Sequence, residues 1–476
     1  MDAGRLKALR KELDTFVSSY ALCIKTEPSR GHFKTYVEGQ VSDLERKNVA
    51  AIALNAGVSP RTLQEFLGTH LWDHLRARDE VQTQVMERHA DPNAIADIDE
   101  TSFAKKGDKT AGVKRQYCGA TGKIDNCVVT VHLGYVAKDF HALLDGDLYL
   151  PEDWLADRAR CRNAGIPDRV VFRPKWQIAL DLLDHALANG VRFRWLAADE
   201  AYGRCGAFRD GVASRGLHYV VEVPCSLLGW TKPPRVVVPA RVAGGAGRPP
   251  CTPRLACDAP EPRLLKALWK RGGPSWKAFH IKDTQAGPVV WEARIVRFFP
   301  AADGLPGEPL WLVVARNVLE PEVKYFYSNA PEDTPAEVLL HVAFSRCHIE
   351  QLFEESKGEV GLDHFEVRQY LALQRHLVLS LVSLLFLEEH TVRLRGEKPV
   401  VEPCGSPLRR GGPTRPGNER SRAHTPPGEG PGPDRILAGI QPAGRSRPPQ
   451  ATAPGPQTTR HQTVPTHEVL QCVLAL

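Results

Sequence analysis

The stretch Phe344–Tyr370, with the sequence FSRCHIEQLFEESKGEVGLDHFEVRQY, is the part of this 476-residue chain around which the rest is organised. Drawn as a helix at about 100° per residue, it brings Arg346, Glu350 and Lys357 to within about 40° of one another. A carboxylate between two cations is an unusual stripe for a core helix. Because a solvated helix face also carries charge stripes, the interpretation depends on residues elsewhere in the chain.

Two aspartates far upstream, Asp99 and Asp199, each adjoin an apolar, strand-like run. Taken singly, an aspartate at a strand end is more often a turn former or a helix cap. Three carboxylates brought together by folding can hold two divalent ions about 3.5–4 Å apart, which is the arrangement that cleaves phosphodiesters. Oxygen ligands suit Mg²⁺ or Mn²⁺. The sequence therefore predicts Asp99, Asp199 and Glu350 as metal ligands, with Arg346 and Lys357 facing phosphate oxygens.

The bulk composition is that of an ordinary soluble protein, with 42% hydrophobic and 25% charged residues. The length favours two to four domains rather than one. A net charge of +6 and a pI near 8.7 are compatible with a polyanionic partner but do not demand one. Charge alone therefore decides little about function.

Neither a membrane span nor a secretory signal is expected. The longest apolar run, Leu377–Leu387, is too short for a bilayer of about 30 Å and indicates a buried helix. The N-terminus is charged throughout and lacks an apolar core segment, so a cytoplasmic location is expected. Eleven cysteines without any CxxC pair argue against a zinc ribbon and offer no disulfide framework.

Residues 1–90 are expected to be wholly helical. Ser42 and Glu45 have the spacing of a capping box and predict a helix over Ser42–Ala56, which Gly57 ends. A second helix is expected to start at Ser59-Pro60, and the pair fits a helix-turn-helix. Such a pair serves either DNA recognition or plain helical packing. The basic residues placed to meet phosphate in the first case are Arg46, Lys47 and Arg61.

Beyond residue 90 the pattern alternates between strands and helices and predicts an α/β domain. The expected strands are 94–101, 113–118, 126–136, 193–198 and 218–224, and the expected helices are 153–189 and 207–215. Asp199 then follows the end of a central strand, which is where α/β sheets place ligand-binding groups. Short runs between Pro- and Gly-rich turns predict a β insertion before helix resumes at Pro335.

Five regions are expected. They are a helical, DNA-binding region (1–90), the first part of the catalytic domain (91–224), the β-rich insertion (225–331), the glutamate-bearing helical part of the catalytic domain (332–397) and a tail (398–476). The tail is rich in Pro, Gly, Arg, Ser and Thr and has no lysine after Lys398. Such a composition predicts disorder, because it buries too little apolar surface to offset chain entropy. A frameshifted reading of a different C-terminus is the alternative explanation.

Three ordered motifs resemble those of DDE transposases of bacterial insertion sequences, which have an RNase H-like catalytic fold. The segment Ile98–Phe103, followed by Lys105, Lys106 and Arg115, is similar to the family's first-aspartate region, and Ala198–Gly203 is similar to its second. Arg346, Glu350 and Lys357, with Gly358–His364 after them, resemble the family's Y-R-E-K signature and its trailing segment. The resemblance runs from about residue 30 to 395.

The resemblance implies a mixed sheet flanked by helices, and metal-dependent cleavage at transposon ends followed by attack of the freed 3′-OH on target DNA. Asp99, Asp199 and Glu350 are then the catalytic ligands of Mg²⁺ or Mn²⁺, and double-stranded DNA and a second protomer are the partners. The DNA-binding residues implied are Arg346, Lys357, Lys105, Lys106 and Arg115. Asp97 and Glu100 are interpreted as bystanders at the strand end.

The chain departs from the signature at two positions. Ala343 stands where the family has tyrosine, and Cys347 where tryptophan is usual. Two other functions remain open, namely a degenerate transposase that binds DNA without cutting it, and an RNase H-like nuclease that lacks strand transfer. The three carboxylates argue against the first, whereas only the basic N-terminal region and the insertion argue against the second.

Overall fold

The structure is a computed structural model whose described residues all fall within one compact unit of the chain. These residues are 3–138, 140–238, 252–268, 275–284 and 287–397. The predicted disordered tail, 398–476, lies outside them.

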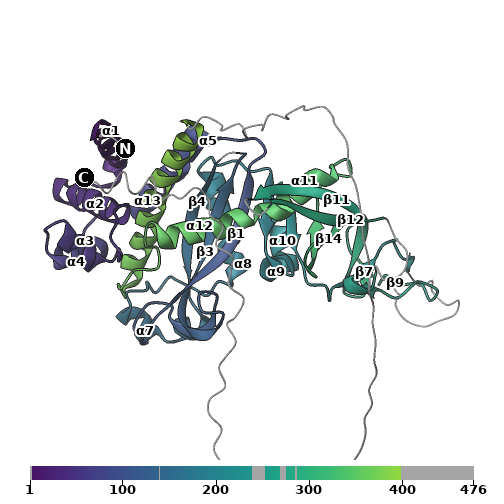
Figure 1. Ribbon diagram of the computed structural model, residues 1–476. Coiled ribbons are helices and arrows are strands. Elements are labelled where there is room, and N and C mark those ends of the chain that lie inside the picture. The colour runs from purple at the N-terminus through teal and green to yellow at the C-terminus, as the bar shows by residue number, and fades with distance from the viewer. Residues whose placement is uncertain (1–2, 139, 239–251, 269–274, 285–286, 398–476) are drawn as a thin grey trace, which may run out of the picture. The chain divides into compact units, whose positions relative to one another are not determined.

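Helices form both ends of the described chain and also cover the sheet between them (Figure 1). Their bounds are α1 (Ala3–Ser19), α2 (Glu27–Gln40), α3 (Val49–Asn55), α4 (Pro60–Gly68), α5 (His74–His89), α6 (Glu152–Ala156), α7 (Arg158–Asn163), α8 (Lys175–Ala188), α9 (Glu200–Gly203), α10 (Gly206–Ser214), α11 (Ala336–Ser345), α12 (Cys347–Gly358) and α13 (Tyr370–Glu397). Two short 3₁₀ turns, η1 (Tyr20–Cys23) and η2 (Leu265–Ala267), complete the helical set in the described residues.

The strands follow the first helices and precede α11. They are β1 (Ile95–Ala104), β2 (Lys114–Cys118), β3 (Lys123–Val136), β4 (His141–Tyr149), β5 (Trp195–Ala198), β6 (His218–Glu222), β7 (Leu228–Trp230), β8 (Val236–Val237), β9 (Arg254–Leu255), β10 (Arg263–Leu264), β11 (Lys277–Thr284), β12 (Gly287–Ala302), β13 (Leu305–Pro306), β14 (Leu310–Asn317) and β15 (Val323–Ser328).

The centre of the sheet has the spatial order β4-β3-β1-β5-β6. The strand β3 runs antiparallel to both β1 and β4, whereas β1, β5 and β6 are parallel to one another. The helix α8 connects β4 to β5 as the crossover that parallel strands need, and α9 and α10 connect β5 to β6. A mixed sheet flanked by helices was predicted and is confirmed.

Two faces of this sheet bury different side chains. Alternation along β1 sends Ile95 and Asp97 to the face that α11 covers, and Ala96 and Ile98 to the opposite face, because successive side chains of a strand point to opposite sides. The same alternation on β5 puts Ala197 on the α11 face. The next positions with this orientation are the residue after the end of β5 and the residue beside it in the middle of β1.

The predicted β insertion extends the same sheet. Its strand β15 pairs with β6, β14 pairs with β15, and β12 pairs with β14, all antiparallel. The strands β7, β10, β11 and β13 attach around β12, and β8 pairs with β9 in a separate small sheet. The insertion therefore continues the edge of the central sheet beyond β6, and α11 packs across β5, β6 and β11.

The long helix α13 joins the N-terminal helices to the sheet, since it packs against α2, α4, α5 and β4. Within its apolar run, Ser380 accepts a hydrogen bond from the amide of Gln40, and Ser383 donates one to the same side chain, at 2.8 and 2.9 Å. These pairs explain the two serines inside the buried run. Arg375 donates to four backbone carbonyls, those of Phe66 and Leu67 in the last turn of α4 and those of His70 and Trp72 just after it.

By length and composition α13 is able to cross a membrane over Tyr370–Thr391, but 83% of its most apolar window is buried within the fold. Leu377–Leu387 is buried throughout, so the predicted core helix is confirmed.

Several local predictions are wrong. The capping box fails because Ser42 donates to the carbonyl of Gly39, and the true cap of α3 is Asn48, whose side chain accepts from the amide of Ala51. Residues 153–189 form three separate helices, and β4 was not predicted. The opening stretch is not one helix: a break at Arg346 separates α11 from α12, and the residues between α12 and α13 are not helical.

Candidate active site

The first two carboxylates belong to neighbouring parallel strands. The pairing of β1 with β5 matches Asp97 with Ala197 and Ile98 with Ala198. Asp99 and Asp199 are the next positions of this register, and each lies two residues after a side chain, Asp97 or Ala197, that points toward α11. The fold therefore brings two aspartates that are 100 positions apart in sequence side by side, where β5 ends against the middle of β1.

The third carboxylate is attached to them through one guanidinium. Arg346, at the break between α11 and α12, places Nη1 2.9 Å from Oδ2 of Asp99 and Nη2 2.6 Å from Oε1 of Glu350. The side chain of Glu350 is 54% exposed, whereas that of Asp99 is only 12% exposed. Glu350 is thus the solvent-facing member of the group, and Asp99 the buried one.

Burial dominates the electrostatics of the two aspartates within β1. It raises the pKa of Asp99 to about 7, against the lowering effect of Arg346, and the charges of Asp199 and Glu350 raise it further. Burial likewise raises the pKa of Asp97 to about 8, although Ser345 donates a hydrogen bond to its Oδ1 at 3.2 Å. A site that resists negative charge in this way favours the binding of a cation, which offsets that cost.

Asp199 also has the structural role that an aspartate at a strand end commonly takes. Its side chain accepts hydrogen bonds from the amides of Ala201 and Tyr202, at 2.9 and 3.3 Å, and so caps α9. Both hydrogen bonds go to Oδ1, which leaves Oδ2 for another partner. The cap fixes the direction of the side chain, so the structural role and ligand binding are compatible.

These three carboxylates fit a divalent cation by their chemistry, because all are oxygen donors and one of them is buried among like charges. Their donor atoms are not all within 4.8 Å of one another in the described residues. The guanidinium of Arg346 lies between Asp99 and Glu350 and supplies the countercharge there.

The two acids interpreted as bystanders are both close to the site. Asp97 is fully buried against Ser345 at the end of α11. Glu100 points away to an ion pair with Lys175, the first residue of α8. Neither Ser345 nor Lys175 was singled out by the sequence, since no motif or spacing distinguishes a serine or lysine that meets an acid about 75 to 250 residues away.

The predicted DNA-contacting lysines differ in their surroundings. Lys105 lies 3.4 Å above the ring of Phe365 and donates to that residue's carbonyl at 2.8 Å, and burial lowers its pKa to about 8. Lys357 lies 5.9 Å from the ring centre of Phe103, and burial lowers its pKa as well. Lys106 is exposed just beyond β1. Among these lysines, Lys106 is therefore the most accessible to a polyanion.

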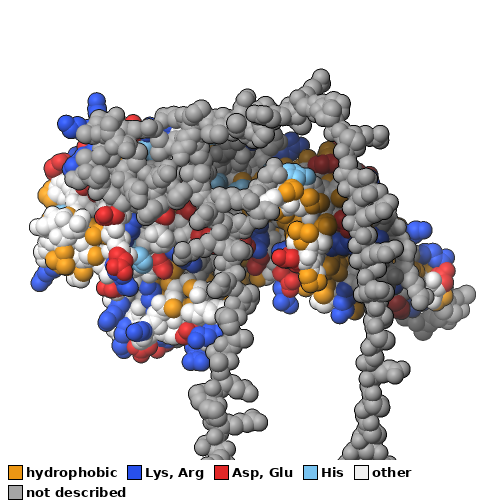
Figure 2. Space-filling view, viewed as in Figure 1, with side chains coloured by type: hydrophobic (Ala, Val, Ile, Leu, Met, Phe, Trp, Pro, Cys, Tyr) orange, Lys and Arg blue, Asp and Glu red, His pale blue; other side chains and the backbone are white. Residues whose placement is uncertain are grey.

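Arg115, the remaining predicted contact, is exposed on β2. In Figure 2 the Lys and Arg side chains of the described residues are interspersed with Asp and Glu on the visible face. The distribution of charge on that face therefore does not indicate a single DNA-binding surface.

The basic residues of the helical region are engaged to different extents. Lys47 is buried, donates to the carbonyl of Glu359, and is therefore not placed to meet phosphate as predicted. Arg46 and Arg61 are exposed and form surface ion pairs with Glu366 and with a neighbour on α4. Surface pairs of this kind contribute little stability, so both guanidinium groups stay available to other anions.

Comparison with known proteins identifies relatives that cover most of the chain. Residues 20–288 match the family described as "DDE superfamily endonuclease". The chain is 32% identical over 381 residues to a probable transposase for insertion sequence element IS701 from Microchaete diplosiphon, an alignment that covers 76% of this chain and 83% of that protein.

Among solved structures, the piggyBac transposase in a synaptic complex with hairpin DNA is similar to this chain, with 12% sequence identity and a TM-score of 0.40. The alignment covers 79% of this chain and 68% of that one.

Proposed function

This chain belongs to the DDE superfamily of endonucleases, as a transposase of the insertion-sequence type, and on that premise we propose that it cuts DNA at insertion-sequence ends and transfers the freed 3′-OH to target DNA. The observation that carries the proposal is the register of β1 and β5, which makes Asp99 and Asp199 neighbours, together with the guanidinium that links Asp99 to Glu350. The sheet order agrees with an RNase H-like catalytic domain.

In this proposal Asp99, Asp199 and Glu350 hold Mg²⁺ or Mn²⁺. When bound, such ions activate the attacking oxygen and stabilise the leaving oxygen of the phosphodiester. The protein's own contribution is to present the three carboxylates in their ionised form. Asp99 must lose its proton to serve as a ligand, and the raised pKa of about 7 makes that loss dependent on pH near neutrality.

We further propose that Arg346 has two partners in turn. Without a cation it carries the countercharge of Asp99 and Glu350. Once these carboxylates hold a divalent cation, its forked guanidinium is available to a DNA phosphate, which accepts two parallel hydrogen bonds. The affinity for DNA would then be higher when the metal ion is bound.

DNA binding is assigned to several elements. Lys357, Lys106 and Arg115 are proposed as phosphate contacts, whereas Lys105 would first have to leave the carbonyl of Phe365. The pair α3 and α4 is proposed as the second DNA contact, through the exposed residues of α4 such as Arg61. We also propose that two protomers act together on paired insertion-sequence ends, in the cytoplasm.

The test compares Glu350→Gln with Glu354→Gln, which removes the same charge from an exposed position of α12. Wild type and Glu354→Gln are expected to cut a plasmid carrying the element's ends when Mg²⁺ is added. Glu350→Gln is expected to bind the same ends in fluorescence anisotropy but leave them uncut. Cleavage by Glu350→Gln would remove this residue from the site.

The same assay separates the alternatives. Wild-type protein that binds the ends without cutting them would be a degenerate transposase. Cutting without any joined product would indicate a nuclease that lacks strand transfer.

A further inference from the structure

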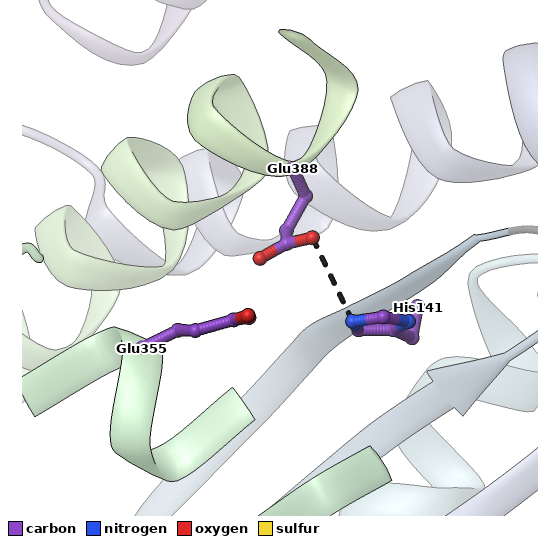
Figure 3. Close-up of side chains that lie close together, drawn as sticks. All are labelled: His141, Glu355 and Glu388. Atoms are coloured by element: carbon purple, nitrogen blue, oxygen red, sulfur yellow. Dashed lines mark ion pairs between the residues drawn. The ribbon is translucent and has the colours of Figure 1, made fainter. Parts of the chain in front are cut away.

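A second group of metal-ligating side chains lies on the other side of α12. His141 at the start of β4, Glu355 on α12 and Glu388 on α13 each offer one ligand atom, and these atoms all lie within 4.8 Å of one another. Figure 3 shows the two carboxylates and the imidazole pointing into the same space from three separate elements. Sequence analysis missed this group, because its members are far apart and none stands in a metal-binding motif.

The group is enclosed and rich in negative charge. The side chains of Glu388 and His141 are 3% and 13% exposed, and their closest charged atoms are 3.7 Å apart, which is an ion pair rather than a hydrogen bond. Even a protonated imidazole balances only one of the two carboxylates. Glu388 is buried and Glu355 partly buried, and their carboxylate oxygens lie within 4.8 Å, so the two negative charges repel each other unless a proton or a cation lies between them.

Glu355 is oriented for a further ligand. The amide of Gln351, one turn earlier on α12, donates to its Oε1 at 2.7 Å and holds the side chain in place. Its Oε2 is fully buried and accepts no hydrogen bond from the described residues. In the metal sites of proteins, a carboxylate ligand is typically held in place by a hydrogen bond from a second residue, as Gln351 holds Glu355 here.

We propose that His141, Glu355 and Glu388 bind a divalent transition-metal ion of the Zn²⁺ class, separate from the ions of the active site. An imidazole with two carboxylates suits Zn²⁺ better than Mg²⁺, which prefers oxygen ligands alone. Three protein ligands leave one position of a tetrahedral zinc for water. The partial exposure of His141 gives the ion a way in.

This ion would act through the position of α12. Glu355 lies five residues after Glu350, which places it about 140° further round the helix. The proposed ion therefore joins the back of α12 to β4 and α13, while the opposite side presents Glu350. The inference stands independently of the proposed DNA cleavage, because it concerns binding and stability rather than catalysis.

The experiment uses the full chain, stripped with EDTA and dialysed into millimolar Mg²⁺ so that sites built from oxygen ligands alone are filled. Zn²⁺ is then added, and bound metal is measured by equilibrium dialysis with elemental analysis while thermal unfolding is followed in parallel. Wild type is expected to retain one more Zn²⁺ than Glu388→Gln and to unfold at a higher temperature when Zn²⁺ is present.

Matched variants decide whether the site is the one proposed. Glu355→Gln, at a less buried position, is expected to weaken this Zn²⁺ binding at least tenfold, whereas Glu354→Gln is expected to bind as wild type does. Because every variant keeps all the cysteines, their zinc binding cancels in the comparison. If Glu388→Gln does not fold, Glu355→Gln alone carries the test. Equal Zn²⁺ binding by wild type and Glu355→Gln would show an ion pair only and overturn the proposal.

Discussion

Replacing the most buried of the proposed ligands should stabilise the metal-free protein. Asp99→Asn keeps the shape of the side chain but removes a charge that the fold disfavours, since burial raises the pKa of Asp99 to about 7 from its ordinary value near 3.8. Proteins commonly carry such costs at functional sites, where the ligand or cofactor offsets them. The stability of this variant therefore distinguishes a carboxylate that stabilises the fold from one that is retained to bind metal.

The sign and size follow from linkage between protonation and folding. Because the folded pKa values of Asp97 and Asp99 are raised, the folded chain binds more protons than the unfolded chain between about pH 4 and pH 8. Stability of the metal-free protein should therefore fall as the pH rises through that window. At about 1.4 kcal/mol per unit, the Asp99 shift sets a ceiling of roughly 4 kcal/mol on the gain from Asp99→Asn at pH 8.

We expect about 2 kcal/mol rather than that ceiling, because the asparagine also loses the ionic contact with Arg346. The assay is urea unfolding followed by tryptophan fluorescence in EDTA at pH 5, 6, 7 and 8. Asp99→Asn should flatten only part of the pH dependence, since Asp97 still titrates. Asp210→Asn, an exposed change on α10, is the control and should behave as wild type.

Two results would refute this reasoning. One is an Asp99→Asn protein no more stable than wild type at pH 8, and the other is a wild-type stability that does not fall between pH 5 and pH 8. Added Mg²⁺ should raise the stability of wild type more than that of the variant. A Mg²⁺ effect of equal size in both would dissociate Asp99 from metal binding.

Three further predictions concern single contacts. Lys357→Ala should weaken binding to the insertion-sequence ends and lower the slope of log affinity against log salt by about one, and an unchanged slope would contradict a phosphate contact. Arg375→Met should lower the free energy of unfolding by at least about 3 kcal/mol in urea, because it strands the carbonyls at the end of α4, whereas the exposed Arg61→Met should change it little. Gly203→Ala would place a Cβ 1.9 Å from the carbonyl oxygen of Glu222, so it should cost at least about 2 kcal/mol and reduce cleavage by displacing the helix that Asp199 caps; wild-type melting and cleavage would contradict this packing.

Most strands could be located in the sequence because they show a distinct hydrophobic pattern. Runs such as Asn126–Val136 and Phe193–Ala198 are apolar enough to require burial on both faces, which favours central strands whatever their partners. The strand β4 was missed because its sequence, HALLDGDLY, includes two acids and a glycine within its nine residues. One of those acids, Asp145, is fully buried and shares a hydrogen bond with His185 on α8. Local sequence patterns do not predict a tertiary contact of this kind.

The residues that cap helices were harder to predict than the positions of the strands. Ser42 and Glu45 have the spacing of a capping box, but Ser42 turns back to the preceding helix and Asn48 caps α3 instead. Asn48 also donates to Glu366, more than 300 residues later, so the start of α3 is set by a distant segment. Local propensity gives way here because a tertiary hydrogen bond changes which residue is available as the cap.

The candidate site shows the same division. Asp99, Asp199 and Glu350 could be proposed as ligands from the sequence, because residue type and motif order are visible without coordinates. What the sequence could not give is the ion pair of Arg346 with Asp99, which is 247 residues away. The pair of Arg346 with Glu350 is an i,i+4 contact that the helix drawn from the sequence already allowed. In the structure Arg346 stands at the break between two helices, and its side chain reaches back to β1 as well as forward along α12.

The backbone at Arg346 keeps right-handed helical angles, so α11 and α12 are joined through a single residue rather than through a loop. The position of Glu350 is therefore set by the packing of α12, whose Ile349 and Leu352 are buried in the core, and by the ion pair with Arg346. The cluster of His141, Glu355 and Glu388 joins another side of α12 to β4 and α13. A Zn²⁺ ion bound there would hold α12 more firmly against these two elements, so its occupancy should alter how readily the exposed Glu350 joins the buried Asp99 in the proposed Mg²⁺ site.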